Sequence, residues 1–206
     1  MKFKTSDGVE YEQDAHGVIH QLNPQPFKYD PSYVSVYDTE AYKRGEETLQ
    51  ALRYGFVCAS HGRPPASILD YGCGNMAFVN FANRQTKAVG YDISCVPGAV
   101  TELRPAEVYT FWDALEHVPD LSIVKGLDCQ TVVISLPWRP EAYAFDSWKH
   151  RKPNEHLHHF DATSLQLFMK SQGWDQLAIS NHEDIIRKGV GSLPNILTMS
   201  FSRLRR

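Results

Sequence analysis

The order of apolar and polar positions along the 206-residue chain predicts an alternation of short strands and longer helices. Brief apolar runs predict buried strands, and apolar positions at helical spacing predict the helices that join them. The strands are predicted around 68–71, 88–92, 107–111, 131–136, 176–180 and 195–203. The helices are predicted at 38–58, from 78 onward, at 121–127 and between Asp161 and Gly173. Strands that alternate with helices are typical of an α/β fold.

The N-terminal third has a different pattern. Residues 1–22 predict short strands joined by the turn signals Asp7-Gly8 and His16-Gly17. We expect one globular domain, with an N-terminal arm and cap helix over 1–60 and the main body over 61–206. The sequence leaves three roles open for the arm: a cover over an active site, a contact to a second copy, or a packed extension without chemistry.

One stretch, residues 67–78, has the order strand, glycine turn, helix. Its apolar run is followed by Asp70, Gly72 and Gly74, and then by a helical pattern. This order is typical of the first half of a nucleotide-binding α/β sheet, in which glycines let the backbone approach a ligand. A second strand ends at Asp92, 20 positions after Gly72. At about this spacing an acidic residue meets ribose hydroxyls in such folds.

Composition narrows the class of protein. The formal net charge of −3 argues against wide nonspecific contact with nucleic acid, and we read the basic clusters at 149–152 and 203–206 as solvated. The four cysteines are widely spaced, which predicts neither a zinc framework nor disulfides. The N-terminus is too polar for a signal peptide, and no apolar run reaches membrane-spanning length. We therefore expect a soluble, cytoplasmic protein.

Several motifs of the sequence resemble those of a known family. LDYGCG at 69–74 and VGYDIS at 89–94 resemble the cofactor motifs of class I S-adenosylmethionine-dependent methyltransferases. Residues 110–120 resemble that family's fourth strand and its exit loop, and 132–137 its fifth strand. Residues 155–165 with Gly173-Trp174 are similar to a segment of the small-molecule branch. The resemblance covers roughly residues 64–202 and leaves the N-terminal third uncovered.

The resemblance implies a fold, a cofactor and a reaction. The fold would be a Rossmann-like αβα sandwich with a mostly parallel sheet and a C-terminal antiparallel hairpin. The cofactor would be S-adenosylmethionine, and its methyl group would pass to an oxygen, nitrogen or carbon of a small-molecule acceptor. Asp92 would hold the ribose hydroxyls, and Ile93 would form an apolar wall for the adenine. The cofactor-binding residues would be Asp70, Gly72, Gly74, Asp92, Ile93, Phe111 and Trp112.

The chain departs from the family pattern at two places. Relatives commonly have glycine where Met76 stands, so Met76 is strained if the backbone there needs a positive φ. If only a close approach to the cofactor is needed, its side chain must turn away. The region between Asp92 and the strand predicted at 107–111 is too short for the usual helix and third strand. We therefore expect a sheet that lacks the third strand, or nearly so.

Histidines supply the candidate catalytic groups. Glu116 and His117 follow the strand predicted at 107–111 and either act in catalysis or organise the loop. His156, His158 and His159 cluster further on, and His156 is favoured as a general base. Because no cysteine or carboxylate accompanies these histidines at ligand spacing, we expect no metal.

The same residues are compatible with other functions. Met76 and the short third-strand region are compatible with a noncatalytic relative that binds a partner. A nucleic-acid methyltransferase is a second rival, although the Asn/Asp-Pro-Pro-aromatic motif of base-methylating relatives is missing. A nicotinamide dehydrogenase fits poorly, since Ala77 takes the place of the third glycine of its motif.

Overall fold

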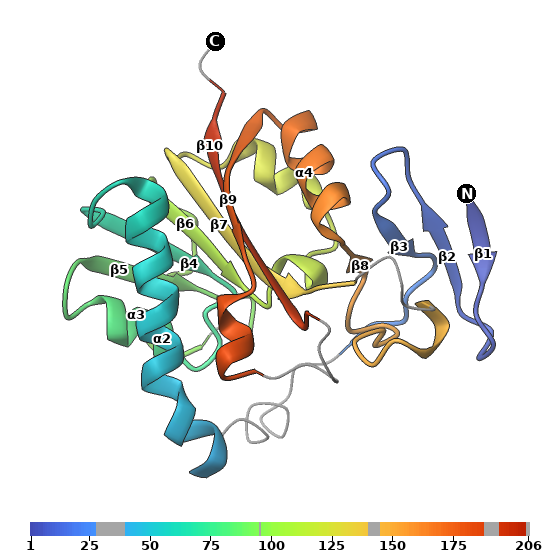
Figure 1. Ribbon diagram of the computed structural model, residues 1–206, viewed down its shortest axis with the longest axis horizontal. Helices are drawn as coiled ribbons and strands as arrows, with labels where there is room; N and C mark the ends of the chain where they lie inside the picture. The colour runs from blue at the N-terminus through green and yellow to red at the C-terminus, as the bar shows by residue number, and fades with distance from the viewer. Residues whose placement is uncertain (28–39, 95, 140–144, 188–193, 205–206) are drawn as a thin grey trace.

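A computed structural model describes residues 1–27, 40–94, 96–139, 145–187 and 194–204 (Figure 1). Its centre is a six-stranded sheet in the order β5-β4-β6-β7-β10-β9. The strands of this sheet are β4 (Ser67–Tyr71), β5 (Lys87–Tyr91), β6 (Val108–Trp112), β7 (Thr131–Pro137), β9 (Trp174–Ser180) and β10 (Ile196–Arg203). The helices are α2 (Glu40–His61), α3 (Ala77–Ala82) and α4 (Ala162–Ser171).

The directions of the strands confirm the predicted sheet. β4 runs parallel to both β5 and β6, and β6 runs parallel to β7. β10 lies between β7 and β9 and runs antiparallel to both. The C-terminal hairpin β9–β10 was therefore predicted correctly, and parallel strands place the carboxyl ends of β4, β5, β6 and β7 along one edge.

The loss of the third strand is also confirmed. Between β5 and β6 the described residues contain only an isolated parallel bridge, Tyr91 to Val100. It includes a hydrogen bond from the Val100 N–H to the Gly90 oxygen at 2.7 Å. Where the resemblance implies a full strand beyond β5, the described residues of this chain form only the bridge at Val100.

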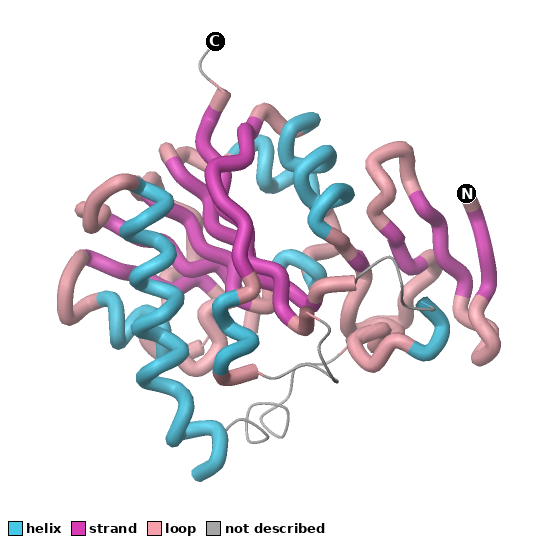
Figure 2. Tube along the Cα trace, in the orientation of Figure 1, coloured by secondary structure: helices cyan, strands magenta, loops and turns pink. Residues whose placement is uncertain are grey.

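Two apolar layers sandwich the sheet (Figures 1 and 2). On one face α2 and α3 pack through Val57, Phe78 and Val79, together with Val133 of β7. On the other face, α4 packs against the residues that flank Val133 in β7. Successive side chains of a strand point to opposite faces of the sheet, so these residues face away from α2 and α3. The residues of that second layer include Val132, Ile134, Leu136, Leu165, Phe168 and Met169. This arrangement is the predicted αβα sandwich.

Local signals set the helix ends. The Asp161 side chain accepts from the Ser164 N–H at 2.8 Å, and the Ser164 hydroxyl accepts from the Asp161 N–H at 2.9 Å, a capping box that begins α4. The helix predicted at 121–127 is instead a 3₁₀ helix, Leu121–Gly126. α2 runs three residues past its predicted end, and the first two positions of its predicted range, 38 and 39, lie outside the described residues.

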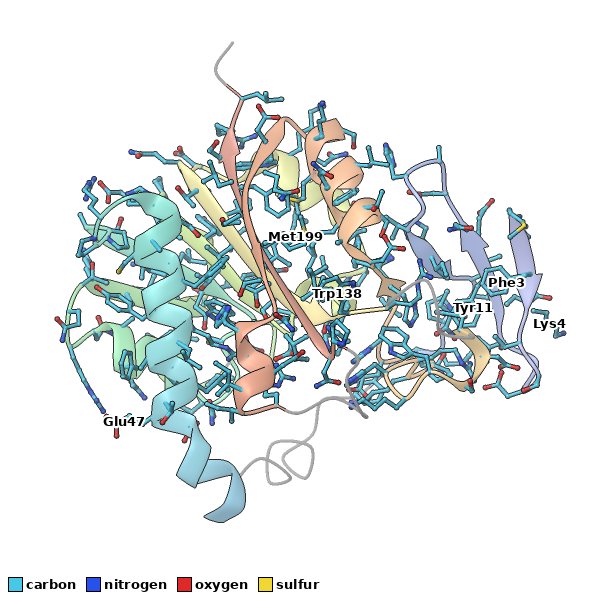
Figure 3. All side chains as sticks on the ribbon, viewed as in Figure 1. Phe3, Lys4, Tyr11, Glu47, Trp138 and Met199 are labelled. Atoms are coloured by element: carbon cyan, nitrogen blue, oxygen red, sulfur yellow. The ribbon has the colours of Figure 1, made fainter. Side chains whose placement is uncertain are left out.

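A second, antiparallel sheet joins the N-terminus to the C-terminal half. Its order is β1-β2-β3-β8, with β1 (Lys2–Lys4), β2 (Glu10–Gln13), β3 (Ile19–Gln21) and β8 (His158–His159). Phe3 and Tyr11, labelled in Figure 3, stack with ring centroids 5.8 Å apart. The short strands predicted within 1–22 are confirmed, and they pack on the segment that carries the clustered histidines.

No helix among the described residues has both the length and the apolar character that crossing a membrane requires.

Candidate functional site at the carboxyl ends of the parallel strands

The glycine turn leaves β4 at Gly72, whose φ of 73° lies in the left-handed region. A Cβ added there would lie 2.7 Å from the Ala114 Cβ, so no larger residue fits. The N–H groups of Gly72 and Cys73 donate to the Tyr91 oxygen at 2.8 and 3.2 Å. The turn is thereby fixed to the end of β5.

Gly74 and Asp92 meet at this edge of the sheet. The Gly74 N–H donates to Asp92 Oδ2 at 3.0 Å, and the Ser94 N–H donates to Asp92 Oδ1 at 2.9 Å. A Cβ added to Gly74 would meet nothing within 4 Å, so the space above the turn is open to a ligand. The neighbouring Ile93 is 77% exposed. The structure therefore brings Gly72, Gly74, Asp92 and Ile93 together.

Met76 adopts the strained conformation that the sequence left open. Its φ is 64° and its ψ is 12°, directly before the first residue of α3. Its Sδ lies 2.6 Å from the position that a Cβ on Gly90 would occupy. The side chain thus turns toward β5, where the missing Cβ of Gly90 leaves room for it.

Asp70 lies beneath the turn and not on its surface. Its side chain is 2% exposed and accepts a 2.7 Å hydrogen bond from the Thr110 hydroxyl of β6. Burial raises the pKa of the Asp70 carboxyl to about 7, although Thr110 and Arg53 act to lower it. The carboxyl ties two parallel strands together, and a direct contact with a cofactor stays a prediction.

Two predicted cofactor contacts need correction. Phe111 is 0% exposed and stacks on Tyr71 in the core, with ring centroids 5.0 Å apart. Trp112 is 6% exposed, packs edge-on against Phe78, and is covered by the Arg53 guanidinium 4.8 Å from its ring. Both side chains therefore belong to the packed layers, on opposite faces of β6, and neither lines an open surface.

A partly buried ionic network stands where β6 and β7 end. Arg187 donates to both oxygens of Asp113, at 2.7 and 2.9 Å, and to Glu183 at 3.0 Å. Arg53 of α2 donates to Glu183 at 2.9 and 3.1 Å and to Asp113 at 3.2 Å. Ser135 of β7 donates to Glu183 at 2.7 Å. The network joins α2, the sheet and the β9–β10 connection.

The charges in this network stabilise one another. Burial acts to raise the pKa of Asp113, but Arg187 and Arg53 overcome it and bring the pKa to about 2. The same two guanidiniums hold the pKa of the fully buried Glu183 below its usual range against burial. Asp113 itself has a φ of 51°, a conformation that few non-glycine residues adopt. Strain at the end of β6 is thus tolerated where two arginines fix the side chain.

The resemblance places Asp113 within the fourth strand and exit loop at 110–120, but the sequence does not predict its partners. Arg53, Glu183 and Arg187 come from two elements separated by more than a hundred residues. Only the i, i+4 spacing of Glu183 and Arg187 gave a local signal. Pairing with Arg53 depends on how α2 packs on the sheet, which the sequence pattern does not contain.

The predicted catalytic histidines lie together, next to Glu116. Glu116 and His117 belong to the 3₁₀ helix Leu115–His117 after β6, and His156 precedes β8. The His117 and His156 rings are 4.7 Å apart at 87°, and His117 Nε2 lies 3.8 Å from Glu116 Oε1. Burial raises the pKa of Glu116 well above its usual range, and Asp113 adds to the effect. Burial also lowers the pKa of His117, and that of His156 to about 2.

The other two histidines serve the second sheet. His158 Nε2 lies 2.9 Å from the Val118 oxygen, and its Nδ1 lies 2.8 Å from His20 Nδ1. His159 is 2% exposed, with Nδ1 3.3 Å from the Ile19 oxygen. Burial lowers the pKa of His158 to about 4 and that of His159 to about 3. Their contacts connect strands and loops and do not point to chemistry.

A cavity of about 590 Å³ lies away from all these groups, with His61, Cys129, Thr131 and Arg203 in its lining. Thr131 begins β7 and Arg203 ends the antiparallel β10, so the cavity sits at the amino ends of the parallel strands. Ligands of open α/β sheets bind outside the carboxyl ends. The glycine turn and Asp92 therefore define the candidate site.

The sequence matches the family model described as a methyltransferase domain over residues 48–179, well over half of the chain. No curated protein matches the sequence.

Solved structures share the fold at low identity. One is the Burkholderia thailandensis 1,6-didemethyltoxoflavin-N1-methyltransferase with bound 1,6-didemethyltoxoflavin and S-adenosylhomocysteine. It is 16% identical, has a TM-score of 0.60, and the match covers 94% of this chain and 98% of that one. Another is the Synechocystis magnesium protoporphyrin IX methyltransferase with bound S-adenosylhomocysteine, 10% identical, with a TM-score of 0.51 and coverage of 87% and 90%. At these identities the likeness establishes the fold.

Proposed function

Because the chain belongs to the class I S-adenosylmethionine-dependent methyltransferase family, we propose that it binds this cofactor and methylates a small-molecule acceptor. The observation that carries the proposal is the glycine turn fixed to Asp92 with open space above Gly74. The two neighbours named above are methyltransferases of small molecules by their names, which supports the same class of acceptor here.

The residues at the turn fit the cofactor. Asp92 accepts bonds from Gly74 and Ser94, and a carboxylate with about four lone-pair positions keeps capacity for a ribose hydroxyl. Each such charge-assisted bond is worth roughly 1.5–3 kcal/mol. Gly74 lets the methionine part approach the backbone, and the exposed Ile93 is placed for the adenine. Asp70 supports the turn from below.

The protein's part in the reaction is chiefly alignment. When bound, S-adenosylmethionine supplies an electrophilic methyl group, so the chain has to orient the acceptor and exclude water. A base helps only where the acceptor must lose a proton near its attack. Of the two predicted bases, His117 is better suited, since a pKa of about 2 makes His156 a weak proton acceptor. The network of Asp113, Glu183 and the two arginines would form the rigid wall beside the acceptor.

We extend the proposal to the organisation of the chain. Residues 1–60 are an arm and a helix added to a methyltransferase body at 61–206, within one domain, and the protein acts in the cytoplasm. Pairing of β3 with β8 supports a single domain, and the free thiols of Cys58, Cys73 and Cys129 suit a reducing compartment.

A noncatalytic role is the second candidate. The strained Met76 and the missing third strand both lie beside the cofactor position, and either could have reduced turnover. A protein of this kind would bind the cofactor weakly and transfer no methyl group.

Transfer of radiolabelled methyl from S-adenosylmethionine to fractions of a cell extract tests the proposal. We expect label in the low-molecular-weight fraction with wild type and little with Asp92→Ala. Label in the nucleic-acid fraction would contradict a small-molecule acceptor and would indicate a nucleic-acid acceptor. Absence of label in every fraction, with cofactor bound, would favour the noncatalytic candidate.

A further inference from the structure

A buried carboxylate without a partner stands beside the proposed methyl-transfer site. Glu116 is 2% exposed, and among the described residues neither of its side-chain oxygens has a hydrogen-bond partner. Buried polar groups are nearly always hydrogen-bonded, and buried carboxyl oxygens that lack a hydrogen-bond partner cost free energy. The proposed methyl transfer makes no use of this carboxylate, so its position needs another explanation.

Lysine and arginine side chains do not pair with Glu116 among the described residues, and His117 Nε2 lies 3.8 Å from its Oε1. Lys152 and Arg187 act on Glu116 through their charge alone. Lys152 makes its ion pair with Glu155 at 2.9 Å, and Arg187 pairs with Asp113 at 2.7 Å. Both basic side chains are therefore engaged with other carboxylates, and the Glu116 oxygens are left for another ligand.

Two imidazoles face the same point. One oxygen of Glu116 and one nitrogen each of His117 and His156 lie within 4.8 Å of one another. The three come from two segments, the turn after β6 and the stretch before β8, which pack together only in the folded chain. Convergence of two imidazoles on an orphaned carboxylate is typical of a metal site.

Backbone carbonyls orient both rings. His117 Nδ1 lies 2.9 Å from the Glu155 oxygen, and His156 Nδ1 lies 2.8 Å from the His150 oxygen. A carbonyl oxygen can only accept, so each Nδ1 carries the proton and each Nε2 carries the lone pair. Metal-binding histidines are held in this way, with the second ring nitrogen donating to a carbonyl or carboxylate.

We propose that Glu116, His117 and His156 bind one divalent first-row transition cation of the Zn²⁺ type. Two nitrogens and one oxygen suit such a cation and do not suit Mg²⁺ or Ca²⁺, which prefer oxygen ligands. Zinc bonds of about 2.0–2.2 Å bring ligand atoms to about 3–3.5 Å from one another, so the site closes by roughly an ångström through side-chain rotation. The His117 side chain is 15% exposed, which gives the cation a way in.

Three protein ligands leave a fourth position, as in open zinc sites. The site is independent of cofactor binding, since none of its ligands belongs to the glycine turn. Metal binding and base catalysis by His117 exclude each other, because the Nε2 lone pair serves only one of them.

Zinc titration of the chelator-treated full-length protein tests the proposal by calorimetry, with absorbance of Co²⁺ as a second readout. We expect one zinc per chain at micromolar or lower Kd, a rise in the melting temperature with zinc, and visible Co²⁺ bands. Glu116→Gln and His156→Ala should each weaken binding on the order of 100-fold and abolish the Co²⁺ bands. His16→Asn, a partly exposed histidine paired with Asp14, is the matched control and should bind as wild type does.

Folding of the variants is checked without metal. Glu116→Gln removes an unpartnered buried carboxylate, so the metal-free variant should melt no lower than metal-free wild type. Wild type that binds no zinc at millimolar concentration would overturn the proposal. Equal binding by wild type, Glu116→Gln and His156→Ala would also overturn it, because the zinc would then be bound elsewhere on the protein.

Discussion

The backbone N–H of Gly74 donates to Asp92 Oδ2 over 3.0 Å, and this bond joins the turn after β4 to the carboxylate that follows β5. The two residues are 18 positions apart. Parallel pairing of β4 and β5 places their carboxyl ends side by side, so the bond follows from the register Asp70 to Gly90. The cofactor position proposed for this chain depends on that hydrogen bond.

The two motif glycines should respond differently to alanine. Gly72→Ala places a Cβ 2.7 Å from the Ala114 Cβ and should lower the free energy of unfolding by about 2–4 kcal/mol. Gly74→Ala meets no atom within 4 Å and should cost only about 1–2 kcal/mol, from its left-handed backbone. Because its methyl enters the space proposed for the cofactor, it should weaken S-adenosylhomocysteine binding about tenfold or more. Urea denaturation and calorimetric titration measure the two effects.

Gly126→Ala is the control for both, since its Cβ also meets nothing within 4 Å. If Gly72→Ala is as stable as Gly126→Ala or more stable, the predicted steric clash with Ala114 is wrong.

Strain at Met76 gives a comparison of two variants. Met76→Gly and Met76→Ala both remove the thioether from Gly90, but only alanine keeps a Cβ at a φ of 64°. We expect the glycine variant to be the more stable by about 1 kcal/mol in urea denaturation. Asn80 is exposed inside α3 and serves as the control. There we expect Asn80→Ala to be more stable than Asn80→Gly by about 1 kcal/mol, because glycine disfavours a helix. Equal stability of the pair at position 76 would contradict the strain.

The partly buried ionic network should be sensitive to single deletions. Glu183→Ala leaves Arg53 without its principal partner and should lower the free energy of unfolding by about 3–5 kcal/mol. Glu10→Ala removes the exposed pair with Lys4, 3.9 Å apart, and should cost at most about 1 kcal/mol. Urea denaturation of both variants measures the two losses in the free energy of unfolding. A Glu183→Ala cost as small as that of Glu10→Ala would show that the network is not a structural support.

Asp70 predicts a dependence of stability on pH. Its pKa is raised by burial from 3.8 to about 7, so between these values the folded state holds a proton that the unfolded state has lost. Stability contributed by the protonated carboxyl is therefore complete below about pH 4 and falls as the pH rises to about 7. The total is roughly 4 kcal/mol at about 1.36 kcal/mol per pH unit.

Substitution by asparagine isolates this effect. The difference in unfolding free energy between wild type and Asp70→Asn should change over pH 4–7 and level off above it. A difference that is constant with pH would mean that Asp70 stays ionised in the folded protein.

Much of the fold could be predicted because its signals are local. The buried strand β7 is mostly apolar and rich in β-branched residues, and the capping box at Asp161 and Ser164 marks the start of α4. The missing third strand could be predicted from the short connection that follows Asp92. The antiparallel hairpin came from the resemblance and not from the pattern.

The site was predicted less completely. Phe111 and Trp112 were expected to line the cofactor because they end β6, yet neighbouring side chains of a strand point to opposite faces, and both faces of β6 are packed. Pairing of Arg53 with Glu183, and of Glu116 with His156, joins segments that are distant in sequence. Such contacts depend on tertiary packing, which periodicity and spacing do not encode.

Calorimetric titration of S-adenosylhomocysteine into wild type and Asp92→Ala tests the central claim most directly, with Asp175→Ala as the control. We predict micromolar binding to wild type, about 8 kcal/mol, unchanged binding to Asp175→Ala, and an affinity at least about tenfold weaker for Asp92→Ala. Wild type that binds nothing at millimolar ligand, or an Asp92→Ala variant that binds as tightly as wild type, would contradict a cofactor site at the ends of β4 and β5.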